Sequence, residues 1–392
     1  MVPLAATLRQ AQPMTPRAFS CACGRPVFFR NSQCLACQRP LGYDAARGAL
    51  LALERVRSGG WREAGLPRRR APQAARYARC ANLDTAAACN WLLDAAEVQG
   101  GFTLCRCCRL TRTLPDLSQP GAGLWWCRIE QAKRRLVSSL IGLKLPVRAK
   151  AEVPDGLGLA FDLLLAPPEG PAVITGHADG VITLDASEAD DARREERRGC
   201  LGEAYRTLLG HLRHETGHYY WQLLVAPGGW LAAFRALFGD EREDYAAALQ
   251  RHYASGPPPD WGQRFVSAYA SAHPWEDWAE TWAHYLHLAD TLDTARSFGL
   301  DGERVELSYE RFGPELLADT GDADAASFLG LINSWMELTG VLNEMSRSMG
   351  VPDFYPFVLS APAVRKLHLV HRVIRAAAQM PAAGAEPLLQ AA

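Results

Sequence analysis

The placement of cysteines constrains this chain most: ten of its eleven cysteines lie within the first 127 of 392 residues. Most stand in short clusters, "CACG", "CLAC" and "CRCC". The opening "MVPLAATLRQAQPMTPRAF" has no charged region followed by a long apolar stretch, so we expect no secretion signal. Clustered cysteines in a chain that is not secreted favour metal binding over disulfides. We therefore expect zinc-binding modules in this part of the chain.

Two groups of four cysteines have spacings suited to zinc. The first group is Cys21, Cys23, Cys34 and Cys37, and the second is Cys80, Cys89, Cys105 and Cys108. Zinc takes four thiolates in a tetrahedron, so two close pairs can hold it without a large core. The first pair is C-x-C instead of C-x-x-C, and Cys107 is left over in the second group. The alternative is that some of these are ordinary buried thiols.

Composition divides the chain further. The predicted segments are a flexible N-terminus (1–18), a zinc ribbon (19–44), a Gly-, Pro- and Arg-rich linker (45–75), a second four-cysteine module (76–118), a connecting helix (119–150), a larger domain (151–375) and a flexible tail (376–392). In the larger domain, "GLAFDLLLA" and "GVITLDAS" are typical of strands, joined across an Asp-Gly hairpin signal, and helical patterns follow. This order predicts an α+β fold that is largely helical in its C-terminal part.

The two halves of the chain differ in charge. Residues 1–150 carry 24 Lys and Arg against 8 Asp and Glu, while residues 151–392 carry 18 against 35. The basic half could bind nucleic acid or an acidic protein partner, but the acidic half is also available as an internal partner. Because no long uncharged apolar run is present, we expect no membrane association and a cytoplasmic location.

The run "YRTLLGHLRHETGHYYWQLLV" contains the motif H-E-x-x-H on a helical pattern. Positions i and i+4 share one helix face, so His214 and His218 can reach one metal ion while Glu215 lies beside it as a general base. His211 faces roughly the same way, and we interpret it as a core histidine. The alternative for the whole motif is two histidines on an ordinary buried helix.

A catalytic zinc needs a third protein ligand and one open position. The metzincin pattern is excluded, because Trp221 and Leu224 stand where it requires glycine and histidine. The later run "SAYASAHPWEDWAETWAHYLH" offers Glu276 and Glu280 on one helix face. Glu276 is the first choice, and Glu280 remains open. The acidic residues after Pro274 would also suit a helix N-terminus without any metal.

The segment "YASAHPWEDWAE" resembles the third-ligand segment of lethal-factor-type gluzincins, in which a tyrosine precedes the ligating glutamate by seven residues. Tyr269 and Glu276 have this spacing. From residue 19 to about 375, the chain is similar to a bacterial family of putative zinc-binding metallopeptidases with an N-terminal zinc ribbon. Its other matching stretches are "GLAFDLLL", "ITGHADGVITLDASEADDARRE", "YRTLLGHLRHETGHYYW" and "FGDEREDYAAALQRHY".

This resemblance implies a zincin-like peptidase domain behind a ribbon, with one catalytic and two structural zinc ions. Zinc on His214, His218 and Glu276 would activate a water, and Glu215 would take its proton. Tyr269 would donate a hydrogen bond to the oxyanion, and Glu280 would orient a ligand histidine. The substrate would be a peptide or protein, and the "GVITLDAS" strand could be the sheet edge against which it pairs in extended form. The alternative function is a zinc-ribbon adaptor with an inactive or structural zincin domain.

Overall fold

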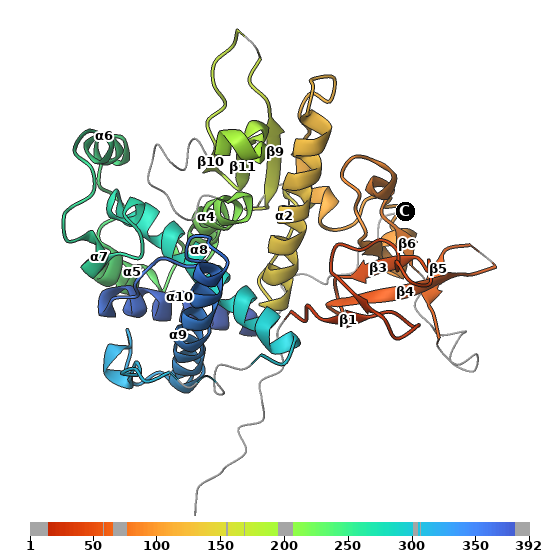
Figure 1. The fold of residues 1–392 in the computed structure, drawn as a ribbon. Coiled ribbons are helices and arrows are strands. Elements are labelled where there is room, and N and C mark those ends of the chain that lie inside the picture. Colours follow the sequence, from red (N-terminus) through yellow and green to blue (C-terminus); the bar gives the residue numbers. More distant parts are fainter. Residues whose placement is uncertain are drawn as a thin grey trace, which may run out of the picture.

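The computed structural model describes residues 15–57, 59–65, 77–153, 156–167, 169–194, 207–300, 305 and 307–380. Figure 1 shows small sheets in the N-terminal part, a long helix α2 beside them, and a larger, mainly helical part. The α+β class predicted from the sequence is confirmed. Most of both predicted flexible ends, residues 1–14 and 381–392, lies outside the described residues. None of the described helices is long and apolar enough to span a membrane.

In the first cysteine group, Cys21 and Cys23 lie in the turn of a short hairpin, β1 (Phe19–Ser20) with β2 (Pro26–Val27), and Cys34 and Cys37 lie in a second turn that the Gln33–Pro40 bridge closes. This group is followed by a three-stranded antiparallel sheet of β3 (Leu41–Asp44), β4 (Ala49–Arg55) and β5 (Trp61–Glu63).

The predicted linker 45–75 is therefore wrong for its first part, because β4 and β5 form there. The reason is the apolar run "ALLALER", whose leucines are buried. The Gly- and Arg-rich residues around this strand led to the prediction of a linker. Residues 58 and 66–75 of the predicted linker lie outside the described residues.

The second cysteine group lies among short elements: β6 (Ala78–Arg79), β7 (Leu92–Leu93) and α1 (Ala95–Gln99). The next strand, β8 (Thr111–Thr113), leaves this module and pairs in parallel with β9 (Ala160–Leu164). A strand within the predicted module 76–118 thus belongs to the sheet of the larger domain. The connecting helix is α2 (Ala122–Gly142), whose buried face includes Trp126, Ile129, Leu136 and Leu140.

The sheet of the larger domain has the order β10 (Gly176–Ala178), β11 (Val181–Asp185), β9, β8. The predicted strands β9 and β11 are present, but they pair in parallel, and the Asp179–Gly180 turn joins β10 to β11 instead. The prediction that the "GVITLDAS" strand forms an open edge is wrong, because β11 is paired on both sides. Within the described residues, the edge strands of this sheet are β10 and β8.

Helices complete the domain, and they cluster opposite the zinc-ribbon part in Figure 1. They are α4 (Leu208–Tyr220), α5 (Leu231–Phe238), α6 (Tyr245–Ser255), α7 (Trp261–Arg264), α8 (Pro274–Ser297), α9 (Ala325–Ser348) and α10 (Ala361–Gln379). Helices α4 and α8 cross so closely at Gly217 that a Cβ atom there would lie 2.8 Å from the Cα of Ala279. Glycine at this position lets the two helices bring their side chains to one point.

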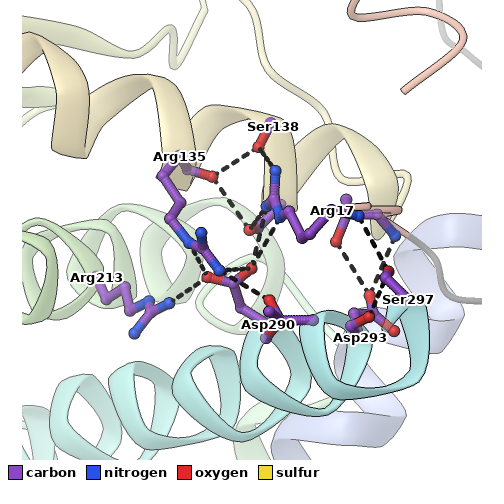
Figure 2. Close-up of polar contacts among 10 residues, drawn as sticks. Arg17, Arg135, Ser138, Arg213, Asp290, Asp293 and Ser297 are labelled. Carbon is purple, nitrogen blue, oxygen red and sulfur yellow. Dashed lines mark hydrogen bonds and ion pairs between the residues drawn. The ribbon is translucent and has the colours of Figure 1, made fainter. Parts of the chain in front are cut away.

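A buried ion cluster joins the N-terminal part to the helices (Figure 2). The carboxylate of Asp290 on α8 forms ion pairs with three arginines: Arg17 at 3.0 Å, Arg135 of α2 at 2.7 Å and Arg213 of α4 at 2.8 Å. Thr15 also bonds Asp293 through its backbone N–H at 3.1 Å. The predicted flexible segment 1–18 is therefore wrong for Thr15 and Arg17, which are buried because these acidic partners hold them.

Candidate metal centres and active site

Three buried side chains from α4 and α8 converge on one point. Nε2 of His214 lies 3.0 Å from Oε2 of Glu276, and Nε2 of His218 lies 3.4 Å from Oε1 of the same carboxylate. One donor atom from each residue lies within 4.8 Å of the others. Ligands of a tetrahedral zinc, each about 2.0–2.1 Å from the ion, stand about 3.3 Å apart. These separations therefore match a three-ligand zinc site.

Local sequence explains how the two helices present these groups. Thr207 caps α4 by accepting the N–H of Gly210, so the helix is well formed through the motif. His273 caps α8 and Pro274 stands at its start, which places Glu276 in the first turn.

The second glutamate of α8 contacts the opposite side of one histidine. Oε1 of Glu280 lies 2.7 Å from Nδ1 of His214, whose Nε2 faces Glu276. The other oxygen of Glu280 accepts a hydrogen bond from Ser267 at 2.6 Å. A carboxylate on the outer ring nitrogen is the usual partner of a metal-ligating histidine, since it fixes the tautomer and the ring.

The electrostatics of this point favour a cation. Burial lowers the pKa of His214, but the adjacent carboxylates of Glu276 and Glu280 outweigh burial and hold the pKa well above its usual range. Burial alone would raise the pKa of Glu276, but the adjacent imidazoles of His218 and His214 hold this pKa well below its usual range. Surroundings that stabilise a buried proton in this way also suit a divalent metal ion.

Several buried polar atoms at this point lack a hydrogen bond within the described part of the chain. They are Oε2 of Glu276, Nδ1 of His218 and Oε2 of Glu215. Oε2 of Glu276 is close to His214 but not aligned with it as a hydrogen bond requires. Buried unpaired groups of this kind call for an ion or water, so the donor set fits a zinc ion.

Glu215 projects beside the two histidines and has its own support. Nε2 of His211 lies 3.3 Å from Glu215, and Nδ1 of the same ring lies 2.7 Å from Glu188. Glu188 also accepts a hydrogen bond from Thr175 at 2.9 Å. Burial raises the pKa of Glu215, but the bond to His211 and the nearby imidazole charges lower it below its usual value. The carboxylate is therefore ionised and able to accept a proton.

The sequence interpretation of His211 as a core histidine missed its contact with Glu215. A histidine one turn before the motif was the available signal. Glu188 lies in a stretch that resembles the family, but nothing in the sequence linked it to His211.

Two tyrosines face the three-residue cluster. The ring of Tyr269 lies 5.9 Å from the ring of His214, centroid to centroid. The hydroxyl of Tyr245, at the start of α6, donates to Oε1 of Glu276 at 2.8 Å. Burial and the charge of Glu276 raise the pKa of both phenols, so each is a neutral donor. Tyr245 was not predicted, because it belongs to a separate helix and no motif spacing links it to α8.

Both predicted cysteine groups come together in space. In the first, the sulfurs of Cys21 and Cys37 are 3.6 Å apart and those of Cys23 and Cys34 are 3.8 Å apart. In the second, Cys89 and Cys105 are 3.7 Å apart, with Cys80 and Cys108 in the same cluster. Four thiolates at about 2.3 Å from a tetrahedral zinc stand about 3.8 Å from each other. The distances therefore suit zinc, and they exclude disulfides, whose sulfurs are about 2.05 Å apart.

The shortened first knuckle, Cys21 and Cys23, still places both of its sulfurs in the cluster. In the other knuckle, the backbone N–H of Cys37 hydrogen-bonds the thiol of Cys34 and lowers its pKa to about 6, which favours the metal-binding thiolate. Cys107 is fully buried beside the second group but is not one of its four sulfurs.

Part of the basic charge of the N-terminal half is used within the molecule. Arg112 binds Asp162 of β9, Arg128 binds Asp191, and Arg109 binds Glu152. Together with the Asp290 cluster, these pairs favour internal docking over binding of nucleic acid or an acidic partner.

The chain was compared with known proteins. Residues 123–373 match the family described as "Putative zinc-binding metallo-peptidase", and residues 18–119 match a family described as "zinc-ribbon domain". The second match covers both cysteine groups and the strands between them as one domain. No solved structure matches the chain.

Its curated relatives include uncharacterized proteins of Mycobacterium bovis and Mycobacterium tuberculosis. They are 42% identical over 360 residues, which covers 91% of this chain and 95% of theirs. The resemblance read from the sequence is thereby confirmed: the chain belongs to the family of putative zinc-binding metallo-peptidases and carries a zinc-ribbon domain ahead of its peptidase domain.

Proposed function

We propose that the chain hydrolyses peptide bonds with a zinc ion held by His214, His218 and Glu276. The observation that carries this proposal is the convergence of their three donor atoms within 4.8 Å. Glu215 follows His214 directly on the same helix, and His211 supports its carboxylate at 3.3 Å. Two histidines and one glutamate leave a fourth position open, as catalytic zinc requires. The two four-cysteine groups would hold structural zinc.

Zinc in this site would polarise the substrate carbonyl and lower the pKa of a water toward neutrality. Glu215 accepts the proton of the attacking water and then passes it to the leaving nitrogen. His211 and Glu188 hold this carboxylate in place during both transfers. Glu280 fixes the ring of His214 through its outer nitrogen.

The oxyanion needs a hydrogen-bond donor, and two neutral phenols are available. Tyr269 beside His214 is the donor implied by the family resemblance, and Tyr245 is a second one that already contacts Glu276. Either hydroxyl can stabilise negative charge that develops on the former carbonyl oxygen.

An extended peptide would pair with the edge strand β10. This strand runs beside the centre, because the ring of His177 on β10 stacks at 6.4 Å from the ring of His218. Backbone pairing would align the peptide, and alternate side chains would then face the domain.

The decisive test is Glu215→Gln in the full-length protein. The amide has nearly the same shape but cannot accept the proton, so hydrolysis of a diverse peptide mixture should fall about a thousandfold with zinc retained. Glu344→Gln, an exposed position, serves as the matched control and should keep wild-type activity. Hydrolysis at the wild-type rate in Glu215→Gln would remove Glu215 from the mechanism. A fully zinc-loaded wild type that cuts no peptide would refute the function.

A further inference from the structure

A cavity of about 340 Å³ lies beside the three-residue cluster, lined by Trp221, Glu241, Tyr245, His273 and Trp275. Two of its wall residues contact the proposed ligands directly. The ring of Trp275 lies 4.0 Å from the ring of His218, and the hydroxyl of Tyr245 bonds Glu276. A group bound in this cavity would therefore lie next to the reacting atoms.

The walls are aromatic and mutually packed. The ring of Trp275 stands edge-on to Trp221 at 6.3 Å and to Tyr245 at 5.9 Å, and Trp221 packs on Phe234 at 5.6 Å. Such contacts hold the rings in place before any ligand arrives. The cavity volume is at the lower end of ligand pockets, which is enough for one large side chain.

The acidic wall residue is already neutralised. Both carboxylate oxygens of Glu241 bind the guanidinium of Arg235, with Nε at 2.9 Å from Oε2. Because Arg235 already occupies this carboxylate, a charged side chain in the cavity would find no free counter-charge here.

We propose that this cavity binds an aromatic side chain of the substrate, in a residue adjacent to the bond that is cut. The inference rests on the proposed function and deepens it, because it names the class of peptide that the site accepts. An aromatic ring matches the volume, offers faces and edges to the surrounding rings, and brings no charge against Glu241.

The first test is hydrolysis of peptides in which one position is varied through the amino acids. At one position next to the cleaved bond, Phe, Tyr or Trp should raise kcat/KM about 10- to 100-fold over Ala, since that is the usual effect of burying a large side chain. Trp221→Ala should remove most of this preference. Trp230→Ala, a partly buried tryptophan that does not line the cavity, should keep it.

The second test measures binding without hydrolysis. Labelled peptides with Phe or Ala at that position are titrated onto zinc-loaded, full-length Glu215→Gln and followed by fluorescence anisotropy. The Phe peptide should bind about tenfold or more tightly, and Trp221→Ala in this background should abolish the difference.

The outcomes separate the two proposals. Hydrolysis without an aromatic preference, or a preference that Trp221→Ala leaves intact, would overturn the cavity assignment while the peptidase function stands. Selective binding of aromatic peptides without any hydrolysis by the wild type would refute the peptidase function, while the cavity would stand as a site for aromatic side chains.

Discussion

The guanidinium of Arg17, just ahead of the zinc ribbon, lies 3.0 Å from the buried carboxylate of Asp290 on α8. The same carboxylate binds Arg213, the residue before His214 on α4. The zinc-ribbon part and the helix of the proposed catalytic motif therefore share one anchor (Figure 2). Docking of the ribbon and placement of the motif are physically connected through it.

Substitutions in this anchor should destabilise the protein unequally. Asp290→Asn leaves three guanidinium groups without their carboxylate and should cost about 3–5 kcal/mol. Arg17→Ala leaves Asp290 with two arginines and should cost about 2 kcal/mol. Thermal unfolding of the zinc-loaded proteins measures both. Asp240→Asn, in an exposed pair with Arg242, should unfold at the wild-type temperature. Equal unfolding temperatures for wild type and Asp290→Asn would show that the anchor does not hold the parts together.

Metal analysis should find three zinc ions per chain, one for each group of converging ligands. His218→Ala should lower the number to two, since the cysteine sites are separate. Cys108→Ser should also remove one ion, whereas Cys107→Ser should keep all three because its sulfur lies outside the cluster. Atomic absorption on dialysed protein gives these numbers. One ion or none in the wild type would contradict the assignment of the sites.

The metal-binding groups could be predicted from local spacing in the sequence. Helical periodicity predicted that His214 and His218 share a face, and their rings lie 4.9 Å apart. The clustering of the cysteines likewise predicted two groups that the structure brings together. In each case, the interacting residues lie within one helix or on short knuckles, so sequence distance and spatial distance are closely related.

Long-range pairing was not predictable in this way. Tyr245, Glu188 and Arg17 reach the centre or its anchor from separate elements. Tyr245 and Glu188 lie in stretches that resemble the family, but the resemblance assigned neither of them a role. The place of β11 inside the sheet also depends on its parallel pairing with β9, which no turn residue indicates. The Asp-Gly signal was real, but it belongs to the short strand β10 that the sequence did not reveal.

Acidification should destabilise the fold through a buried histidine of α10. Burial lowers the pKa of His371 to about 4, and the hydroxyl of Tyr285 lies 2.8 Å from its Nδ1. In the unfolded chain the pKa returns to about 6.5, so the unfolded state binds the proton more readily. The stability contribution is therefore complete above about pH 6.5 and is lost as the pH falls toward about 4.

The matched variant is His371→Gln, which keeps an acceptor for Tyr285 but does not titrate. Between pH 7 and pH 5 the wild type should lose about 2 kcal/mol more unfolding free energy than this variant. Urea unfolding at both pH values, followed by circular dichroism, gives the difference. Identical pH dependence in the two proteins would show that His371 is not responsible.

The choice between Glu276 and Glu280 as third zinc ligand can be tested by removing each carboxylate. Glu276 faces the Nε2 atoms of both histidines, whereas Glu280 faces only the outer Nδ1 of His214. Loss of an outer partner typically weakens metal affinity about 10- to 100-fold, while loss of a direct ligand leaves only two donors. We therefore expect Glu276→Ala to lose the ion on dialysis, and Glu280→Ala to retain it with measurably weaker affinity in a competition with a chelating dye. Glu337→Ala, a buried glutamate of α9 outside the centre, controls for removing a buried carboxylate and should bind as the wild type does. Retention of the ion by Glu276→Ala together with its loss from Glu280→Ala would reverse the assignment.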